Sequence, residues 1–141
     1  MNTDLMFSSE KMDWTTPIDK FKEWDKEFNF TLDPCSTHEN AVCEKHYTIK
    51  ENGLLQDWGG ETVYCNPPYG REIKHWVKKC YEESLKPNTT VVLLIFARTD
   101  TKYFHDYIYG KAELRFIKGR LKFGNCKNSA PFPSMIAIFR S

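Results

Sequence analysis

The chain has 141 residues, of which 40% are hydrophobic and 15% aromatic, so its size and composition are those of one folded domain and exclude a disordered chain. No apolar run approaches the roughly 20 residues that a membrane span requires, and the mixed, polar N-terminal residues do not resemble a signal segment. We therefore expect a cytoplasmic protein without membrane contact. Its five scattered cysteines do not form a disulfide framework.

The net charge is only +1, but the charges are unevenly distributed along the chain. Residues 1–63 carry six Lys and Arg against thirteen Asp and Glu, a net charge of −7, whereas residues 111–141 carry seven against one, a net charge of +6. The first six cations of this basic segment are Lys111, Arg115, Lys118, Arg120, Lys122 and Lys127. Such a segment is typical of nucleic-acid binding, although a solvated basic hairpin would have the same composition.

No repeat or linker divides the chain, so we expect a flexible arm over residues 1–13 and one domain over residues 14–141. Thr16 and Pro17 open the first predicted helix, because threonine is a common helix cap and proline suits the first turn. The later elements, in chain order, are a strand over 28–32, a short helix over 38–45 capped by Ser36 or Thr37, a brief strand over 47–49, a strand over 61–65, a helix over 71–85, a strand over 89–97, a helix over 101–109 capped by Asp100, and strands over 113–118, 120–123 and 135–140.

The alternation of strands and helices predicts an open, mostly parallel α/β sheet with helices on both faces. The continuous apolar run over residues 89–97 is typical of a central strand that is buried on both faces. The last strands have no helix between them and should form an antiparallel hairpin at one edge. Ligands of such sheets bind beyond the carboxyl ends of the strands. Because Asp33, Asn66 and Arg98 each follow a predicted strand, we expect these side chains to converge on one cleft.

The segment Asn66-Pro67-Pro68-Tyr69 is a stiff turn, because each proline fixes one φ angle and removes one backbone donor. An ordinary strand-to-helix connector could have this sequence. The turn also suits the binding of a flat ring with an exocyclic amine: the Asn66 side chain and a prolyl carbonyl can accept hydrogen bonds from the amine, and Tyr69 can stack on the ring. We therefore treat this turn as the candidate reactive site.

Other chemistries have weaker support in the sequence. Cys35-x-x-His38 and Cys43-x-x-His46 offer four possible zinc ligands, but a turn and a buried helix face explain these cysteines better, and we predict no metal site. The chain lacks the P-loop spacing of an NTPase and the Gly-x-Ser-x-Gly turn of an α/β-hydrolase.

The motif Asn66-Pro67-Pro68-Tyr69 matches the catalytic motif of amino-methylating DNA methyltransferases that use S-adenosylmethionine. Further motifs in matching order are Trp14-Thr15-Thr16-Pro17, Phe30-Thr31-Leu32-Asp33-Pro34-Cys35-Ser36, Asn40-Ala41, Tyr47, Gly53-Leu54, Trp58, Ala97-Arg98-Thr99-Asp100-Thr101, Gly119-Arg120-Leu121 with Phe123, and Phe132-Pro133-Ser134. From Trp14 to Phe139 the chain thus resembles the small phage-encoded, Dam-like DNA N-6-adenine methyltransferases. The resemblance implies a Rossmann-like methyltransferase fold with an antiparallel C-terminal hairpin.

The resemblance also implies the roles of particular residues. The catalytic residues would be Asn66, Pro67, Pro68 and Tyr69. The residues that bind S-adenosylmethionine would be Thr16, Pro17, Asp33, Pro34, Cys35, Ser36, Asn52 and Leu54. The DNA-binding residues are expected on other grounds. The basic charge of the last segment indicates that Lys118, Arg120 and Lys122 contact the DNA, and the position of Arg98 after a predicted strand indicates that it reaches the target nucleotide or orders the loop through Asp100. Two departures from the wider superfamily are the glycine-free loop at Asp33 and the presence of Asn52 where an acidic residue often meets the adenine end of the cofactor.

Two alternatives remain open from the sequence. One is a methyltransferase of the same fold that acts on another amine, such as cytosine, RNA or a protein glutamine. The other is a non-catalytic DNA-binding relic. For the adenine methyltransferase we expect double-stranded DNA as the partner, with the target base flipped out of the duplex, and no separate target-recognition domain. The sequence predicts neither the recognition sequence nor the oligomeric state.

Overall fold

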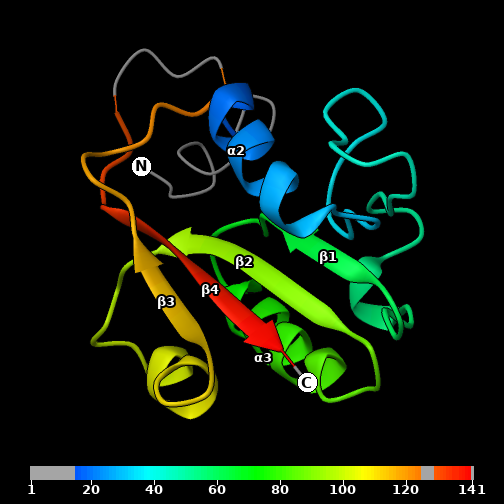
Figure 1. The fold of residues 1–141 in the computed structure, drawn as a ribbon. Helices are drawn as coiled ribbons and strands as arrows, with labels where there is room; N and C mark the ends of the chain where they lie inside the picture. Colours follow the sequence, from blue (N-terminus) through cyan, green and yellow to red (C-terminus); the bar gives the residue numbers. More distant parts are fainter. Residues whose placement is uncertain (1–14, 125–128, 141) are drawn as a thin grey trace.

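The computed structural model describes residues 15–124 and 129–140 as an α/β fold (Figure 1). The helical elements are α2 (Ile18–Phe28), the 3-10 turn η1 (Gly53–Leu55), α3 (Ile73–Ser84) and the π-helical segment η2 (Phe104–Ile108). The strands are β1 (Thr62–Cys65), β2 (Thr90–Phe96), β3 (Glu113–Phe116) and β4 (Ser134–Arg140). None of the described helices is long and apolar enough to cross a membrane.

The four strands form one mixed sheet in the order β1-β2-β4-β3. β1 is parallel to β2, whereas β4 is antiparallel to both β2 and β3. The expected antiparallel pair at one edge is therefore present, but the expectation of a mostly parallel sheet is not confirmed. The parallel part stays short because the predicted strand over residues 28–32 contributes only an isolated bridge from Leu32 to Val63, and Asp33 bridges to His46.

β2 is the central element of the core, and its side chains alternate between two buried faces. Val91, Leu93 and Ile95 pack with residues of α3 in one cluster. Val92, Leu94 and Phe96 pack in a second cluster with Phe21 and Trp24 of α2. Figure 1 shows α3 passing behind the strands. The two covered faces confirm the interpretation of the continuous apolar run as a central strand, since each successive side chain must be buried on the opposite face.

The predicted helix over residues 38–45 is wrong, because the chain forms turns and bends there. Thr37 and Asn40 close one turn reciprocally: the Thr37 N–H donates to Asn40 Oδ1 over 2.7 Å, and the Asn40 N–H donates to Thr37 Oγ1 over 3.1 Å. Side chains of this kind satisfy nearby backbone groups and so compete with helix formation. The brief strand over residues 47–49 is likewise not formed.

Two later predictions also need correction. The helix over residues 101–109 is a shorter helical segment over residues 102–108 that includes η2, so Thr101 and not Asp100 directly precedes it. The segment 120–123 is not a strand. Its apolar residues Leu121 and Phe123 are buried in the cluster on the α2 side of the sheet, so tertiary packing rather than strand pairing explains the alternating pattern.

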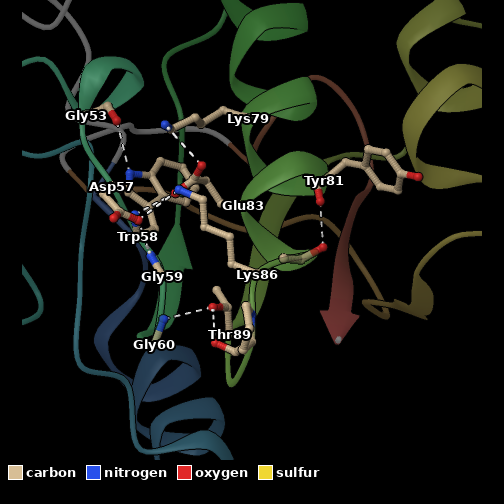
Figure 2. Close-up of polar contacts among 12 residues, drawn as sticks. Gly53, Asp57, Trp58, Gly59, Gly60, Lys79, Tyr81, Glu83, Lys86 and Thr89 are labelled. Carbon is tan, nitrogen blue, oxygen red and sulfur yellow. Dashed lines mark hydrogen bonds and ion pairs between the residues drawn. The ribbon is translucent and has the colours of Figure 1, made fainter.

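A polar network joins the loop before β1 to α3 (Figure 2). The buried Glu83 carboxylate accepts a hydrogen bond from the Trp58 N–H over 2.6 Å and one from Lys86 Nζ over 2.8 Å. The Trp58 indole N–H donates to the Gly53 carbonyl over 3.0 Å. Gly53 itself packs so closely that a Cβ there would lie 2.1 Å from the Pro34 carbonyl oxygen. The network therefore fixes the position of η1 against both α3 and the loop after Leu32.

The Glu83→Ala substitution should lower the free energy of unfolding by about 1–3 kcal/mol, because it leaves the buried Trp58 N–H without an acceptor. Urea unfolding followed by tryptophan fluorescence measures this change. Glu82→Ala, at an exposed position of the same helix, is the matched control and should change stability by less than about 0.5 kcal/mol. Equal effects of the two substitutions would contradict the role given to Glu83.

Candidate functional site

A cavity of about 650 Å³ lies at the carboxyl end of β1. Of the residues predicted to form the site, it brings together Thr16, Asp33, Pro34, Cys35, Ser36, Asn52, Asn66, Pro67 and Pro68. The predicted residues that do not line it are Pro17, Leu54, Tyr69, Arg98, Asp100, Lys118, Arg120 and Lys122. The expected convergence is thus correct for Asp33 and Asn66 but wrong for Arg98.

Asn66 directly follows β1, and two hydrogen bonds fix it in the cavity wall. Its side-chain Nδ2 donates to Thr16 Oγ1 over 3.1 Å. The Cys35 thiol donates to its carbonyl oxygen over 3.3 Å. The Cys35 sulfur also lies 3.8 Å from the sulfur of Cys65, and burial raises the pKa of the Cys35 thiol. Both the side chain and the backbone of Asn66 are therefore held before any ligand binds.

Thr16 does not have the predicted role of a helix cap. Pro17 occupies the N-cap position of α2, and no side chain caps the helix. The Thr16 side chain instead points to β1, where its Oγ1 lies 2.5 Å from the hydroxyl oxygen of Tyr64 and accepts the bond from Asn66. Both partners are buried, with Thr16 5% and Tyr64 1% exposed. Sequence reasoning missed Tyr64, although its position two residues before Asn66 places it on the same side of an extended chain.

Asp33 organises the loop that follows the Leu32 bridge. Its Oδ1 accepts a hydrogen bond from the Cys35 N–H over 3.3 Å, and its Oδ2 accepts one from the Val42 N–H over 3.1 Å. Burial raises the pKa of Asp33, and these two hydrogen bonds oppose the increase. Neither Asp33 nor the expected caps Ser36 and Thr37 cap a helix here, because no helix forms over residues 38–45. Asp33 thus ties both ends of the 33–42 loop together at the cavity wall.

Tyr69 follows the two prolines and packs against the sheet. Its ring stacks on Phe96 with centroids 4.2 Å apart and an interplanar angle of 4°. Burial raises the pKa of Tyr69 far above its ordinary value, so the phenol stays neutral. Because Phe96 covers one face of the ring, a planar ligand could stack only on the opposite face.

The cationic residues beyond β2 and β3 lie outside the cavity. The guanidinium of Arg98 lies over the ring of Phe132 at 4.7 Å from its centroid. Arg120 Nη1 donates to the Pro131 carbonyl over 3.0 Å. Both arginines therefore contact the same loop at residues 131–132, while Lys118 and Lys122 are exposed.

The four residues of the zinc hypothesis do not converge. His38 Nδ1 lies 2.8 Å from His46 Nε2. The Cys35 thiol, in contrast, bonds to the carbonyl of Asn66. Within residues 15–124 and 129–140, no group of three or more His, Cys, Asp or Glu side chains is arranged to hold a metal ion.

Comparison with known proteins identifies the family of the chain. Residues 5–141 match the family model of the DNA N-6-adenine-methyltransferases (Dam). The chain is 32% identical over 139 residues to a DNA N-6-adenine-methyltransferase of Haemophilus phage HP1, covering 93% of this chain and 80% of that protein. It is 32% identical over 110 residues to the DNA N-6-adenine-methyltransferase of Escherichia phage T1, covering 77% of this chain and 45% of that protein. The chain belongs to the Dam family of phage-type DNA N-6-adenine methyltransferases.

Proposed function

We propose that this chain transfers a methyl group from S-adenosylmethionine to the N-6 amine of adenine in DNA, in the cytoplasm of a bacterial cell. The observation that carries the proposal is that the Asn66-Pro67-Pro68 turn and the Asp33 loop both line the cavity of about 650 Å³. Family membership supports the reaction type. The short parallel part of the sheet, with ligand groups at its carboxyl end, is compatible with a methyltransferase fold.

The cavity suits S-adenosylmethionine in size and polarity. Its volume of about 650 Å³ lies within the range of roughly 300–1,000 Å³ that is common for small-molecule sites. Its wall contains the carboxylates of Asp33 and Glu39, which favour a cationic ligand, and the polar Asn52. When bound, S-adenosylmethionine supplies an electrophilic methyl group on a sulfonium. We assign its binding to the Asp33–Ser36 loop at one end and to the Asn52-Gly53 turn at the other.

The residues of the turn would prepare the amine for transfer. The Asn66 Oδ1 and the Pro67 carbonyl would accept hydrogen bonds from the adenine amine, which draws its lone pair out of conjugation and directs it towards the methyl group. These acceptors act strongly because they are positioned in advance. The face of the Tyr69 ring opposite Phe96 would contact the base. Since the amine is inaccessible inside a duplex, the base would have to be flipped into the cavity.

The DNA backbone would contact the basic segment beyond β3. Lys118, Arg120 and Lys122 follow β3 closely in the chain and are exposed. Arg98 and Arg120 both contact the loop at residues 131–132, so they would also order the surface that faces the duplex. Asp100, exposed in the turn after Arg98, belongs to this surface as well.

Asn66→Ala should lower the rate of methyl transfer by about 100-fold or more, because it removes one preorganised acceptor. DNA is incubated with labelled S-adenosylmethionine and the wild-type or variant protein, and the labelled nucleoside is identified by mass. The fold and the affinity for S-adenosylmethionine should remain, as checked by thermal unfolding and calorimetry. Near-normal turnover of the variant would refute the role of Asn66. Labelled cytosine instead of labelled adenine would show that the target base is cytosine.

Asp33→Ala should weaken S-adenosylmethionine binding and lower stability, because the Cys35 and Val42 N–H groups lose their acceptor and the loop loosens. Isothermal titration calorimetry measures the affinity. Asp25→Ala is the matched control: it removes a carboxylate that accepts from the Phe30 N–H over 2.9 Å and does not line the cavity. That control should lower stability but leave the affinity unchanged. Equal affinities for all three proteins would remove Asp33 from the cofactor site.

Replacing Lys118, Arg120 and Lys122 together with Ala should weaken DNA binding for all sequences and flatten its salt dependence by up to about three units of slope, because each neutralised phosphate releases condensed counterions. Fluorescence anisotropy at several salt concentrations measures both quantities. The comparison variant replaces Lys74 and Lys78, which are exposed on α3, with Ala. If that variant loses the salt dependence and the triple variant keeps it, the DNA surface lies on α3 instead.

A further inference from the structure

The buried side chains of Tyr64 and Thr16 and the half-buried side chain of Asn66 form a chain of hydrogen bonds at the reactive turn. The hydroxyl of Tyr64 lies 2.5 Å from Thr16 Oγ1, and Thr16 Oγ1 accepts a hydrogen bond from Asn66 Nδ2 over 3.1 Å. The Tyr64 ring is fixed by aromatic residues of the α2 side, with centroid distances of 5.1 Å to Phe21 and 5.2 Å to Phe30. The packing of the core therefore determines where the Tyr64 hydroxyl lies.

The start of α2 does not require this chain of hydrogen bonds, because no side chain caps that helix. The reaction does require it, because the side-chain amide of an asparagine has two chemically opposite ends. Only the orientation with Nδ2 towards Thr16 directs the acceptor Oδ1 away from Thr16. The reverse orientation would offer an N–H donor to the adenine amine, which is itself a donor.

We propose that Thr16 and Tyr64 are positioning residues that hold the Asn66 amide with its oxygen directed towards the target amine. This inference rests on the proposed function, and it assigns to Thr16 and Tyr64, which both line the cavity, a role that is exerted through Asn66. Thr16 therefore acts through Asn66 in addition to lining the cavity.

We assign the donor role in the Thr16–Tyr64 hydrogen bond to Thr16, and this direction explains why both hydroxyls are needed. When the Thr16 hydroxyl donates its proton to Tyr64, its oxygen can only accept from Asn66, and this selects Nδ2. Without the Tyr64 hydroxyl, the Thr16 proton loses that acceptor and competes for Asn66 Oδ1, which turns the amide over. Burial raises the pKa of Tyr64 well above its ordinary value, so the phenol remains a neutral partner at every working pH.

The test compares Thr16→Val, Thr16→Ser and Tyr64→Phe with the wild type. Thr16→Val and Tyr64→Phe should each lower kcat at least about 10-fold, with the KM for DNA changed less than about 3-fold, because a misdirected acceptor acts in the transition state and not in binding. Thr16→Ser, which keeps the hydroxyl, should restore most of kcat. Adding Thr16→Val to Asn66→Ala should cause no further loss.

The matched control is Thr89→Val, which removes a buried hydroxyl that accepts from the Gly60 N–H over 2.8 Å, far from the cavity (Figure 2). It should lower thermal stability about as much as Thr16→Val while leaving kcat unchanged. The double variant Tyr64→Phe with Thr16→Val should be no slower than Thr16→Val alone, since no hydroxyl proton remains to turn the amide over. If the two substitutions instead reduce kcat independently, or if Thr16→Val retains the wild-type kcat, the inference is overturned.

A second measurement does not depend on activity. The side-chain amide signals of Asn66 in a ¹⁵N-¹H NMR spectrum, identified by their loss in Asn66→Ala, should shift in Thr16→Val and Tyr64→Phe but not in Thr89→Val. Unshifted signals in these two variants would contradict the positioning of Asn66 by Thr16 and Tyr64. If the signals shift as expected but the wild-type protein does not methylate DNA, the proposed reaction is refuted and the positioning of Asn66 stands, so the two failures are distinguishable.

Discussion

The site depends on the parallel alignment of three chain segments: the residues around Leu32, then β1, then β2. The Thr31 N–H donates to the Thr62 carbonyl over 2.7 Å, the Tyr64 N–H donates to the Leu32 carbonyl over 2.9 Å, and β1 pairs in parallel with β2. Because these segments run in the same direction, their carboxyl ends meet at one edge of the sheet. Asp33 and Asn66, more than thirty residues apart in the chain, thereby come to line one cavity. A one-residue shift in this register would turn Asn66 to the opposite face.

The core and the reactive turn are joined through β1. Val63 and Cys65 pack in the cluster on the α3 side, whereas Tyr64 packs in the cluster on the α2 side and carries its hydroxyl to Thr16. The strand β1 therefore packs in the core on both faces of the sheet, and this packing fixes the backbone that leads into Asn66. On the opposite wall, the network of Glu83, Trp58 and Gly53 attaches the Asn52 turn to α3. Catalytic sites work best on such rigid supports, because little reorganisation is left for the reaction itself.

The parts of the fold that followed from the sequence are those with strong local signals. The apolar run of β2, the amphipathic pattern of α3 and the strand before the two prolines each indicate one structure, and Asp33 and Asn66 could be placed because they follow strands. The predictions from the sequence failed where side-chain contacts, several of them with residues distant in the chain, determine the local structure. Thr16 was expected to cap a helix, but its partner Tyr64 lies 48 residues away. Thr37 and Asn40 satisfy each other in a turn where a helix was expected, and the isolated bridge at Leu32 replaces a full strand. Arg98 follows β2 as predicted, yet its guanidinium lies over the ring of Phe132 and it does not line the cavity.

The place of β4 in the sheet has a consequence for how the protein is made. β4 lies between β2 and β3 and supplies Met135, Ala137 and Phe139 to one core cluster and Ile136 and Ile138 to the other. During synthesis, β2 emerges from the ribosome before residues 134–140 exist, so the backbone N–H and C=O groups along the edge that pairs with β4 await their partners. Unpaired strand edges of this kind can pair with other chains. The core on both faces of the sheet, and with it the support of Asn66, can therefore be completed only after translation has passed Asn66 by some seventy residues.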